Sequence, residues 1–331
     1  MPFRKARLAA LNWKRSKKVN TDRTLRTREL LGLLPVSGGM FFRVCKTVLT
    51  PRRHGPRRTV RAALTGALFL PLFAVIQMIH WTGLLLDELF FRNYRHTPVE
   101  EPLFVLGVPR SGTSFLHRVL SEDSNCFTTL KTWELLLAPS ICEKKLFLAL
   151  LKADRAAGSP VERCLRRIER RLTGEANRIH GFSLSAPEED FLTLLPVMSC
   201  FILVVPFPFC DDIWDLSRFD SAIPEDRRRL IAAFYRSCLQ RHLYVFGRGR
   251  RLLSKNVSFS PMVRTLKQAF PDAKWVGCLR DPAAVVPSQL SALAPGMRLF
   301  GHDPAHPQFR QRVVNMLKFY YGHLTSELGG A

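Results

Sequence analysis

A glycine-rich turn after residue 106 has the residue types and spacing of a phosphate-binding loop. Residues 103–120 read LFVLGVPRSGTSFLHRVL; the apolar start predicts a buried strand, and residues 115–120 predict the opening of a helix. Gly107 and Gly112 form a GxxxxG spacing that the hydroxyl residues Thr113 and Ser114 follow. Glycines let backbone N–H groups approach an oxyanion, and the N-terminus of the following helix favours negative charge. The segment therefore predicts a site for a phosphate or a related anion.

The position of the cation distinguishes this loop from that of the nucleotide triphosphatases. Thr113 stands where those proteins carry a lysine, and Arg110 supplies a cation inside the loop instead. The chain also lacks a convincing aspartate-ended strand of the kind that would complete such a site. These features argue against ATP or GTP hydrolysis and favour another phosphorylated donor. A membrane-anchored P-loop kinase or NTPase stays as the less favoured alternative.

A second segment places an arginine and a serine where they could hold one phosphate group. Residues 274–279 are a second apolar run, which predicts a strand that ends at Arg280. Ser288 lies eight residues further on, in the next predicted helix. An arginine at a strand end and a serine on the following helix can grip a single phosphate monoester.

Together, these segments resemble the sulfotransferases that use 3′-phosphoadenosine-5′-phosphosulfate (PAPS). Residues 109–114 match the 5′-phosphosulfate loop of that family, PRSGTT, with Ser114 in place of the last threonine. Arg280 and Ser288 match the family's 3′-phosphate motif. The resemblance implies that PAPS is the co-substrate and that no metal or redox cofactor takes part. The residues that it assigns to PAPS binding are Pro109, Arg110, Ser111, Gly112, Thr113, Ser114, Arg280 and Ser288.

Further signatures resemble the large branch of the family, and the resemblance runs from about residue 86 to residue 324. His180 precedes residues 187–190, a match to the H…PEED signature, and residues 270–273 match the FPDA that leads into Arg-Asp-Pro. Lys255 matches the lysine of an LKSPxH signature, but residues 256–258 read NVS, and Phe259 falls where its histidine is expected. These departures keep open an inactive, membrane-associated PAPS-binding member of the family.

Sulfuryl transfer needs cations near the leaving phosphate and a base that takes the acceptor's proton. By analogy with phosphoryl transfer, charge builds on the bridging oxygen, and Arg110 suits that charge. The resemblance gives Lys255 a place at the transferring group; a solvated loop lysine is the structural alternative. For the base, the resemblance favours Glu134, with His180 second and Glu189 third. A helix cap or salt bridge is the structural alternative for Glu134, and an acidic helix start is the alternative for residues 188–190.

Composition divides the chain into a basic start and a more balanced remainder. Residues 1–61 hold 17 Lys and Arg and 2 Asp and Glu, a net charge of +15, whereas the other 270 residues hold 33 and 25. We therefore predict a basic N-terminal arm over residues 1–61, which would suit an anionic surface. The eight cysteines show no metal-binding spacing.

An apolar segment follows the arm. Residues 62–86 contain no charge, and arginines precede them at positions 52, 53, 57, 58 and 61. The length would allow a transmembrane helix, although Pro71, Gln77 and His80 fit a surface-lying or buried helix as well. The arginines would place the N-terminus in the cytoplasm. In a eukaryotic cell this orientation predicts a Golgi membrane protein with a lumenal catalytic domain; in a bacterium it predicts peripheral attachment.

The expected architecture is an α/β fold with a mostly parallel, P-loop-like sheet flanked by helices. We predict a membrane-associated segment and linker over residues 62–99 and the sulfotransferase-like domain over residues 100–331, with a helical insertion at about 130–250. Because the family usually carries a Tyr-Glu-Asp-type segment beyond this point, we expect the domain to be truncated at its C-terminus. The predicted partners are a membrane and a hydroxyl-bearing acceptor such as a glycan or lipid. No nucleic-acid partner is predicted, and the sequence does not indicate an oligomeric state.

Overall fold

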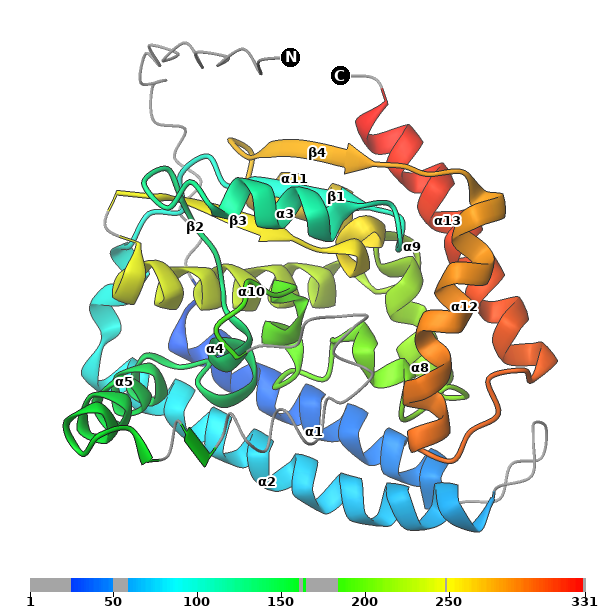
Figure 1. The fold of residues 1–331 in the computed structure, drawn as a ribbon, viewed down its shortest axis with the longest axis horizontal. Helices are drawn as coiled ribbons and strands as arrows, with labels where there is room; N and C mark the ends of the chain where they lie inside the picture. The colour runs from blue at the N-terminus through cyan, green and yellow to red at the C-terminus, as the bar shows by residue number, and fades with distance from the viewer. Residues whose placement is uncertain (1–24, 50–58, 161–162, 165–183, 248, 330–331) are drawn as a thin grey trace.

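A four-stranded parallel sheet forms the centre of the molecule. The computed structural model describes residues 25–49, 59–160, 163–164, 184–247 and 249–329 (Figure 1). The strands are β1 (Leu103–Gly107), β2 (Phe127–Thr128), β3 (Arg251–Lys255) and β4 (Lys274–Cys278), in the order β2-β3-β1-β4. All three neighbouring pairs are parallel, so the predicted fold class is confirmed.

The strand at the centre of the sheet is the one that precedes the glycine-rich loop. Phe104, Val105 and Leu106 of β1 are fully buried, because helices cover both faces of the sheet. Parallel pairing brings the carboxyl ends of β1, β3 and β4 to one edge. Gly107, Lys255 and Cys278 end these strands. The glycine-rich loop, the side chain of Lys255 and the segment that leads to Arg280 therefore meet at this edge.

Helices surround the sheet and form the predicted insertion. Helix α3 (Thr113–Ser121) follows the loop, and α10 (Glu225–Phe246) lies below the sheet in Figure 1. Within the described residues, the other α-helices after β1 are α4 (Thr132–Leu137), α5 (Ile141–Ala156), α8 (Asp211–Trp214), α9 (Phe219–Ala222), α11 (Val263–Ala269), α12 (Pro282–Leu299) and α13 (Pro307–Leu328). Short 3-10 helices are η1 (Arg92–His96), η2 (Asp190–Leu194), η3 (Phe201–Val204), η4 (Asp215–Arg218) and η5 (Val257–Met262).

Two N-terminal helices form a further layer beneath α10. They are α1 (Thr27–Leu49) and α2 (Val60–Phe90), which cross the lower edge of Figure 1. Leu30, Leu33, Met40 and Val44 of α1 are fully buried and belong to the same hydrophobic core as β1. Part of the segment predicted as a basic arm is therefore a helix that packs on the domain. Composition did not indicate this helix, because the positive charge of the segment outweighs the four apolar residues that form its buried face. Residues 1–24 of that arm lie outside the described part of the chain.

Candidate functional site

The loop between β1 and α3 has a backbone that requires glycine at two places. A Cβ at Gly107 would lie 2.5 Å from the carbonyl oxygen of Cys278, so the close approach of β1 and β4 excludes any side chain there. Gly112 precedes α3 with a φ of 91°, in the left-handed region that glycine adopts freely. Arg110 has a φ of 66°, which is uncommon for a residue with a side chain. The positive φ values of Arg110 and Gly112 turn the chain sharply before it enters α3.

Inside this loop, one hydroxyl has no partner. The Oγ atom of Ser111 is buried and makes no hydrogen bond within the described residues. A buried polar atom without a partner is uncommon in a native structure and calls for an explanation. This hydroxyl lies against β1, 2.8 Å from where a Cβ of Gly107 would stand, and Ser111 does not line the cavity described below.

The structure brings the two predicted donor-binding motifs into direct contact, although about 170 residues separate them. The Nε–H of Arg110 donates to the Oγ of Ser288 over 3.0 Å. Nη1 of Arg280 donates to the carbonyl oxygen of Arg110 over 3.1 Å. Arg280 is exposed, and the hydroxyl of Tyr321 on α13 donates to its carbonyl oxygen. The predicted 3′-phosphate pair therefore adjoins the predicted phosphosulfate loop.

A cavity of about 820 Å³ opens beside this contact. Five of the predicted donor residues of the loop line it, and so do Arg280 and Lys255. The loop residues are Pro109, Arg110, Gly112, Thr113 and Ser114. A volume of this size is ordinary for a small-molecule site. Four cations line this single cavity, Arg110, Arg118, Lys255 and Arg280, and they provide the positive field that a phosphosulfate donor needs.

Lys255 ends β3 and is almost fully buried, with 5% of its surface exposed. Its Nζ donates to Oε1 of Glu189, which also lines the cavity. A buried ammonium needs such a partner, because an unpaired charge away from water is costly. The solvated-loop alternative for Lys255 is therefore wrong: the lysine is a fixed cation at the wall of the cavity.

The carboxyl groups of the PEED segment separate into two environments. Glu188 and Glu189 line the cavity, whereas Asp190 is buried behind them. Asp190 accepts hydrogen bonds from the side chains of Tyr235, Ser254 and Asn256. Burial raises the pKa of Asp190 to about 7, although the hydroxyl donors favour its charged form.

Asn256 explains one departure from the family signature. Besides donating to Asp190, its side chain accepts from the backbone N–H of Phe191 over 3.2 Å. This clamp joins the end of β3 to the segment that carries Glu189. Asn256 therefore helps to hold Lys255 and Glu189 against each other.

Sequence reasoning missed a histidine on the wall of the cavity. His117 lies on α3, one turn after Thr113, and only 2% of its surface is exposed. Its Nε2 shares a 2.8 Å hydrogen bond with Oγ1 of Thr129. Burial, and after it the charge of Lys255, lowers the pKa of His117 to about 3, so the ring is neutral at physiological pH. Helical spacing could have indicated it, because His117 stands four residues after Thr113, and residues i and i+4 of a helix share one face.

Glu134, the first-ranked base, lies away from the cavity. It is 2% exposed, and one oxygen accepts from the backbone N–H of Lys131 as part of the capping box of α4. The other oxygen lies 2.7 Å from Nδ1 of His242. Burial alone would raise the pKa of Glu134, but His242 and Lys144 outweigh burial and hold that pKa below its usual value. The helix-capping alternative describes these contacts, and Glu134 is not among the residues that line the cavity.

His180, ranked second as the base, lies outside the described residues. Glu189 is thus the one of the three predicted bases that the described part of the chain places at the cavity. Among the described residues, no group of three or more His, Cys, Asp or Glu side chains is arranged to hold a metal ion.

A parallel sheet whose strand ends carry a glycine-rich loop, with cations lining one cavity, is an arrangement with which α/β proteins commonly bind phosphorylated ligands. Comparison with known proteins makes the class specific. The sequence model described as the sulfotransferase family matches residues 102–326, so the chain belongs to the sulfotransferase family. A search of curated proteins returned no match.

Two solved structures have a similar fold. The crystal structure of sulfotransferase STF1 from Mycobacterium tuberculosis H37Rv superposes with a TM-score of 0.63 at 17% identity, covering 95% of this chain and 76% of that one. Sulfotransferase STF9 from Mycobacterium avium gives a TM-score of 0.56 at 15% identity, covering 86% of this chain and 74% of that one. At these identities the likeness establishes the fold.

Proposed function

We propose that this chain transfers a sulfuryl group from PAPS to a hydroxyl group of an acceptor. The contact between the two donor motifs carries the proposal: Arg110 bonds Ser288, and Arg280 bonds the backbone of the same loop. A donor with phosphates at both ends of its ribose would contact both motifs at once. Membership of the sulfotransferase family supports this reaction class.

The chemistry assigns separate tasks to the cavity residues. The acceptor oxygen forms a bond to sulfur while the bond between sulfur and the bridging phosphate oxygen breaks, which releases the 3′,5′-bisphosphate. Lys255 and Arg110 would stabilise the charge that develops on the sulfuryl and bridging oxygens. The acceptor's proton would pass to Glu189, whose carboxylate lies at the cavity beside Lys255. A highly charged donor would compete for Lys255 and leave Glu189 free to act as a base.

The acceptor that best suits the cavity has an apolar body. The apolar lining of the cavity includes Phe201, Ile202, Val204 and Val205, and Leu293 and Met316 contribute to it from α12 and α13. Apolar walls favour ligands that remove apolar surface from water. Of the predicted glycan and lipid acceptors, this lining supports a lipid-like hydroxyl.

Phe259 supports a second candidate, a PAPS-binding protein without transfer activity. It replaces the histidine of the LKSPxH signature and is buried in the core, 1% exposed, in edge contact with Tyr235. If the signature histidine is indispensable, donor binding would persist without catalysis. Placement in the Golgi lumen stays a prediction from the sequence.

Two measurements separate these functions. Titration of purified protein with the 3′,5′-bisphosphate product tests the donor site, and both candidates predict binding. Incubation with sulfur-35-labelled PAPS and detergent-dispersed membrane lipid, or with soluble glycans in parallel, tests transfer and acceptor class. No bisphosphate binding would refute both candidates, and label in soluble glycans alone would refute the lipid-like acceptor.

The base assignment has its own test. Glu189→Gln should abolish single-turnover transfer while bisphosphate affinity changes by less than about threefold. The matched control is Glu225→Gln, which alters an exposed glutamate at the start of α10. Normal transfer by Glu189→Gln would eliminate Glu189 as the base.

A further inference from the structure

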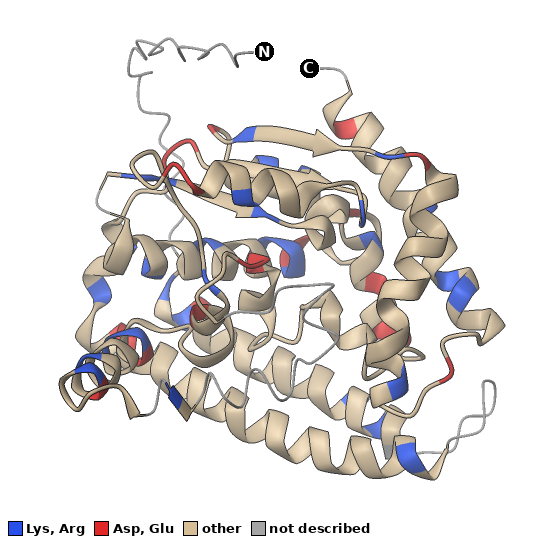
Figure 2. Ribbon diagram, viewed as in Figure 1, with Lys and Arg blue, Asp and Glu red and all other residues tan. Residues whose placement is uncertain are grey.

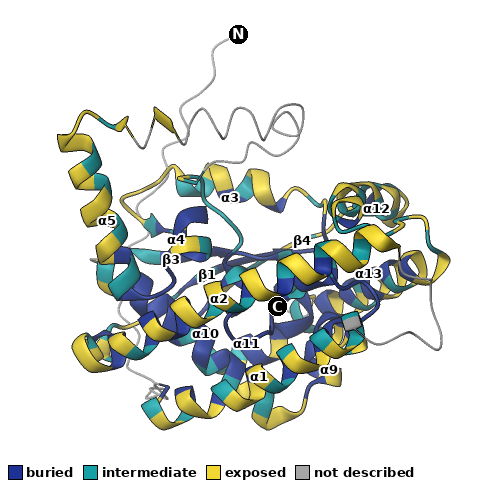
Figure 3. Ribbon diagram, turned by 90° about the horizontal axis from the view of Figure 1, so that it is seen from below, coloured by how far each residue is buried: buried dark blue, intermediate teal, exposed yellow. Residues whose placement is uncertain are grey.

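One face of α2 exposes an unusually long apolar stripe. The helix has 31 residues, so it is about 46 Å long at 1.5 Å per residue. The stripe follows helical spacing, and its side chains are 38–75% exposed: Leu64, Leu68, Leu72, Val75, Ile79 and Leu86. Figure 3 shows this face of α2 exposed along the underside of the molecule. A continuous apolar surface of this kind marks an interaction site, because its exposure to water is unfavourable in free energy.

The opposite face of α2 is bound to the globular domain near its C-terminal end. The indole N–H of Trp81 donates to the carbonyl oxygen of Pro196 over 2.9 Å. Asp87 is fully buried, pairs with Arg241 at 2.9 Å and accepts from the backbone N–H groups of Ile141 and Cys142 at the start of α5. A Cβ at Gly83 would lie 2.4 Å from the Oγ of Ser140, so α2 and α5 are in close contact.

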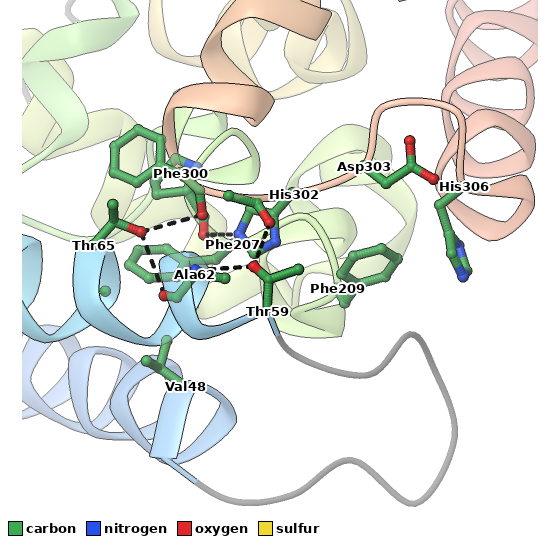
Figure 4. A pocket seen from close by; sticks show the side chains of 13 residues that line it. Val48, Thr59, Ala62, Thr65, Phe207, Phe209, Phe300, His302, Asp303 and His306 are labelled. Carbon is green, nitrogen blue, oxygen red and sulfur yellow. Dashed lines mark hydrogen bonds between the residues drawn. The ribbon is translucent and has the colours of Figure 1, made fainter.

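The N-terminal half of α2 is bound as well. Figure 4 shows the small cavity of about 80 Å³ where this half meets the loop between α12 and α13. Thr59 donates to the carbonyl oxygen of Gly301 over 2.8 Å, and Thr65 donates to that of Phe300 over 3.2 Å. Phe69 packs against Phe207 and Phe300 with ring centroids 5.9 and 5.2 Å away.

These contacts determine how α2 could meet a membrane. By length and composition α2 is the one helix in the described part of the chain that could cross a bilayer. Crossing would require lipid on all sides of the helix, but the domain covers one side from Thr59 to Glu88. A spanning α2 would therefore have to leave the domain and lose the contacts that Thr59, Phe69 and Trp81 make with it.

We propose that α2 lies in the plane of an anionic lipid bilayer, with its apolar stripe inserted at the boundary between headgroups and acyl chains. Interfacial helices insert an apolar face about 5–10 Å deep in this way. The catalytic domain takes the place of the polar face that such helices otherwise present to water. This inference concerns attachment and does not depend on the proposed reaction.

The charge around the stripe supports an anionic lipid surface. Exposed cations stand at both ends of the stripe, Arg61 before it and Arg92 after it, and Figure 2 shows the lower edge between them drawn almost entirely without charge. In the sequence, residues 1–61, which run up to the start of the stripe, carry a net charge of +15. Basic segments beside a membrane surface bind anionic lipid. A second copy packed on the stripe in antiparallel fashion would bring Arg61 and Arg92 together, which like charges disfavour.

Vesicle flotation with the full-length protein tests the proposal. Vesicles with 30% phosphatidylserine in phosphatidylcholine should bind it, and pure phosphatidylcholine should bind it at least tenfold less. The double variant Leu68→Asp with Leu72→Asp should lose binding to the anionic vesicles at least tenfold. Val119→Asp is the matched control, because Val119 is 52% exposed on α3, remote from α2 (Figure 1), and should bind like the unaltered protein.

A second measurement separates an in-plane helix from a spanning one. Protease tags at the two termini, in sealed membrane vesicles, should be cleaved from the same side if α2 lies in the plane. Cleavage from opposite sides would overturn the proposal. The proposal would also be overturned if the full-length protein co-floated with neither type of vesicle. It would likewise be overturned if the protein were a dimer in buffer and the double variant Leu68→Asp with Leu72→Asp were a monomer.

Discussion

Lys255→Met offers the sharpest test of how the cavity divides its work between binding and transfer. Methionine keeps a long apolar side chain and removes the ammonium, which in the structure bonds Glu189 at the wall of the cavity. If Lys255 contacts the group that moves, its loss should act on the transition state. The 3′,5′-bisphosphate product lacks that group, so its affinity should report on the remaining donor contacts.

The size of the effect follows from the position of Lys255. It is 5% exposed and fixed by a charged partner, so it needs little reorganisation during the reaction. Removing one such preorganised group typically costs about 10²- to 10³-fold in kcat, or about 2.7–4 kcal/mol. The affinity for the bisphosphate should fall by less than about tenfold, which is 1.4 kcal/mol or less.

The assay combines single-turnover transfer from labelled PAPS with calorimetric titration of the bisphosphate. Lys267→Met is the matched control, because Lys267 lies on α11 and donates to the carbonyl oxygen of Glu327 instead of lining the cavity. A thermal melt confirms that each variant folds. Unchanged transfer in Lys255→Met would refute the reasoning. Equal losses of transfer and bisphosphate affinity would show instead that Lys255 holds a phosphate.

Three more predictions concern the proposed 3′-phosphate site at Arg280, the buried Asp87–Arg241 ion pair and His117. Arg280→Ala should lower bisphosphate affinity about 10- to 150-fold, since a hydrogen bond to a charged group contributes about 1.5–3 kcal/mol, whereas equal titration curves would reject this role. Arg241→Met should lower the free energy of unfolding, measured in urea, by about 3–5 kcal/mol, because it removes the cation that pairs with the fully buried Asp87. A loss of less than about 1 kcal/mol would contradict this expectation. The pKa of His117, about 3 in the folded protein against 6.5 ordinarily, lets the unfolded chain bind the extra proton, so stability falls as pH drops below 6.5. Between pH 6 and 4, His117→Gln should remove about 1.4 kcal/mol of that loss per pH unit, as measured by urea titrations at each pH. If stability fell with pH as steeply in the variant as in the unaltered protein, His117 would not be the cause of the loss.

Local sequence was sufficient to predict that the two proposed donor-binding motifs would lie together. The turn after β1 needs Gly107 and Gly112 for reasons of backbone geometry, and short apolar runs next to it predict β1 and β4 directly. Arg280 follows its strand at a fixed spacing from Ser288. Because parallel strands end at one edge of a sheet, this local order already implied that both motifs would meet. The contact between Arg110 and Ser288 agrees with that expectation.

The acid and base groups depended on contacts between distant residues. The local sequence Lys-Thr-Trp-Glu is the same whether its glutamate faces a cavity or a core. His242, 108 positions away, is what binds Glu134 inside the domain. Likewise, Lys255 acquires its fixed position from Glu189 and the Asn256 clamp, which the chain assembles only on folding.

The membrane prediction shows the same division. Hydropathy is a property of composition, and it identified residues 62–86 as apolar enough to enter lipid. It does not say which side of a helix another part of the chain will cover. Phe207 and Gly301 reach α2 from far along the sequence, and Arg241 pairs with its Asp87. Such pairing depends on the whole arrangement of elements, since the free energy of burying one helix face comes from side chains that no local window contains.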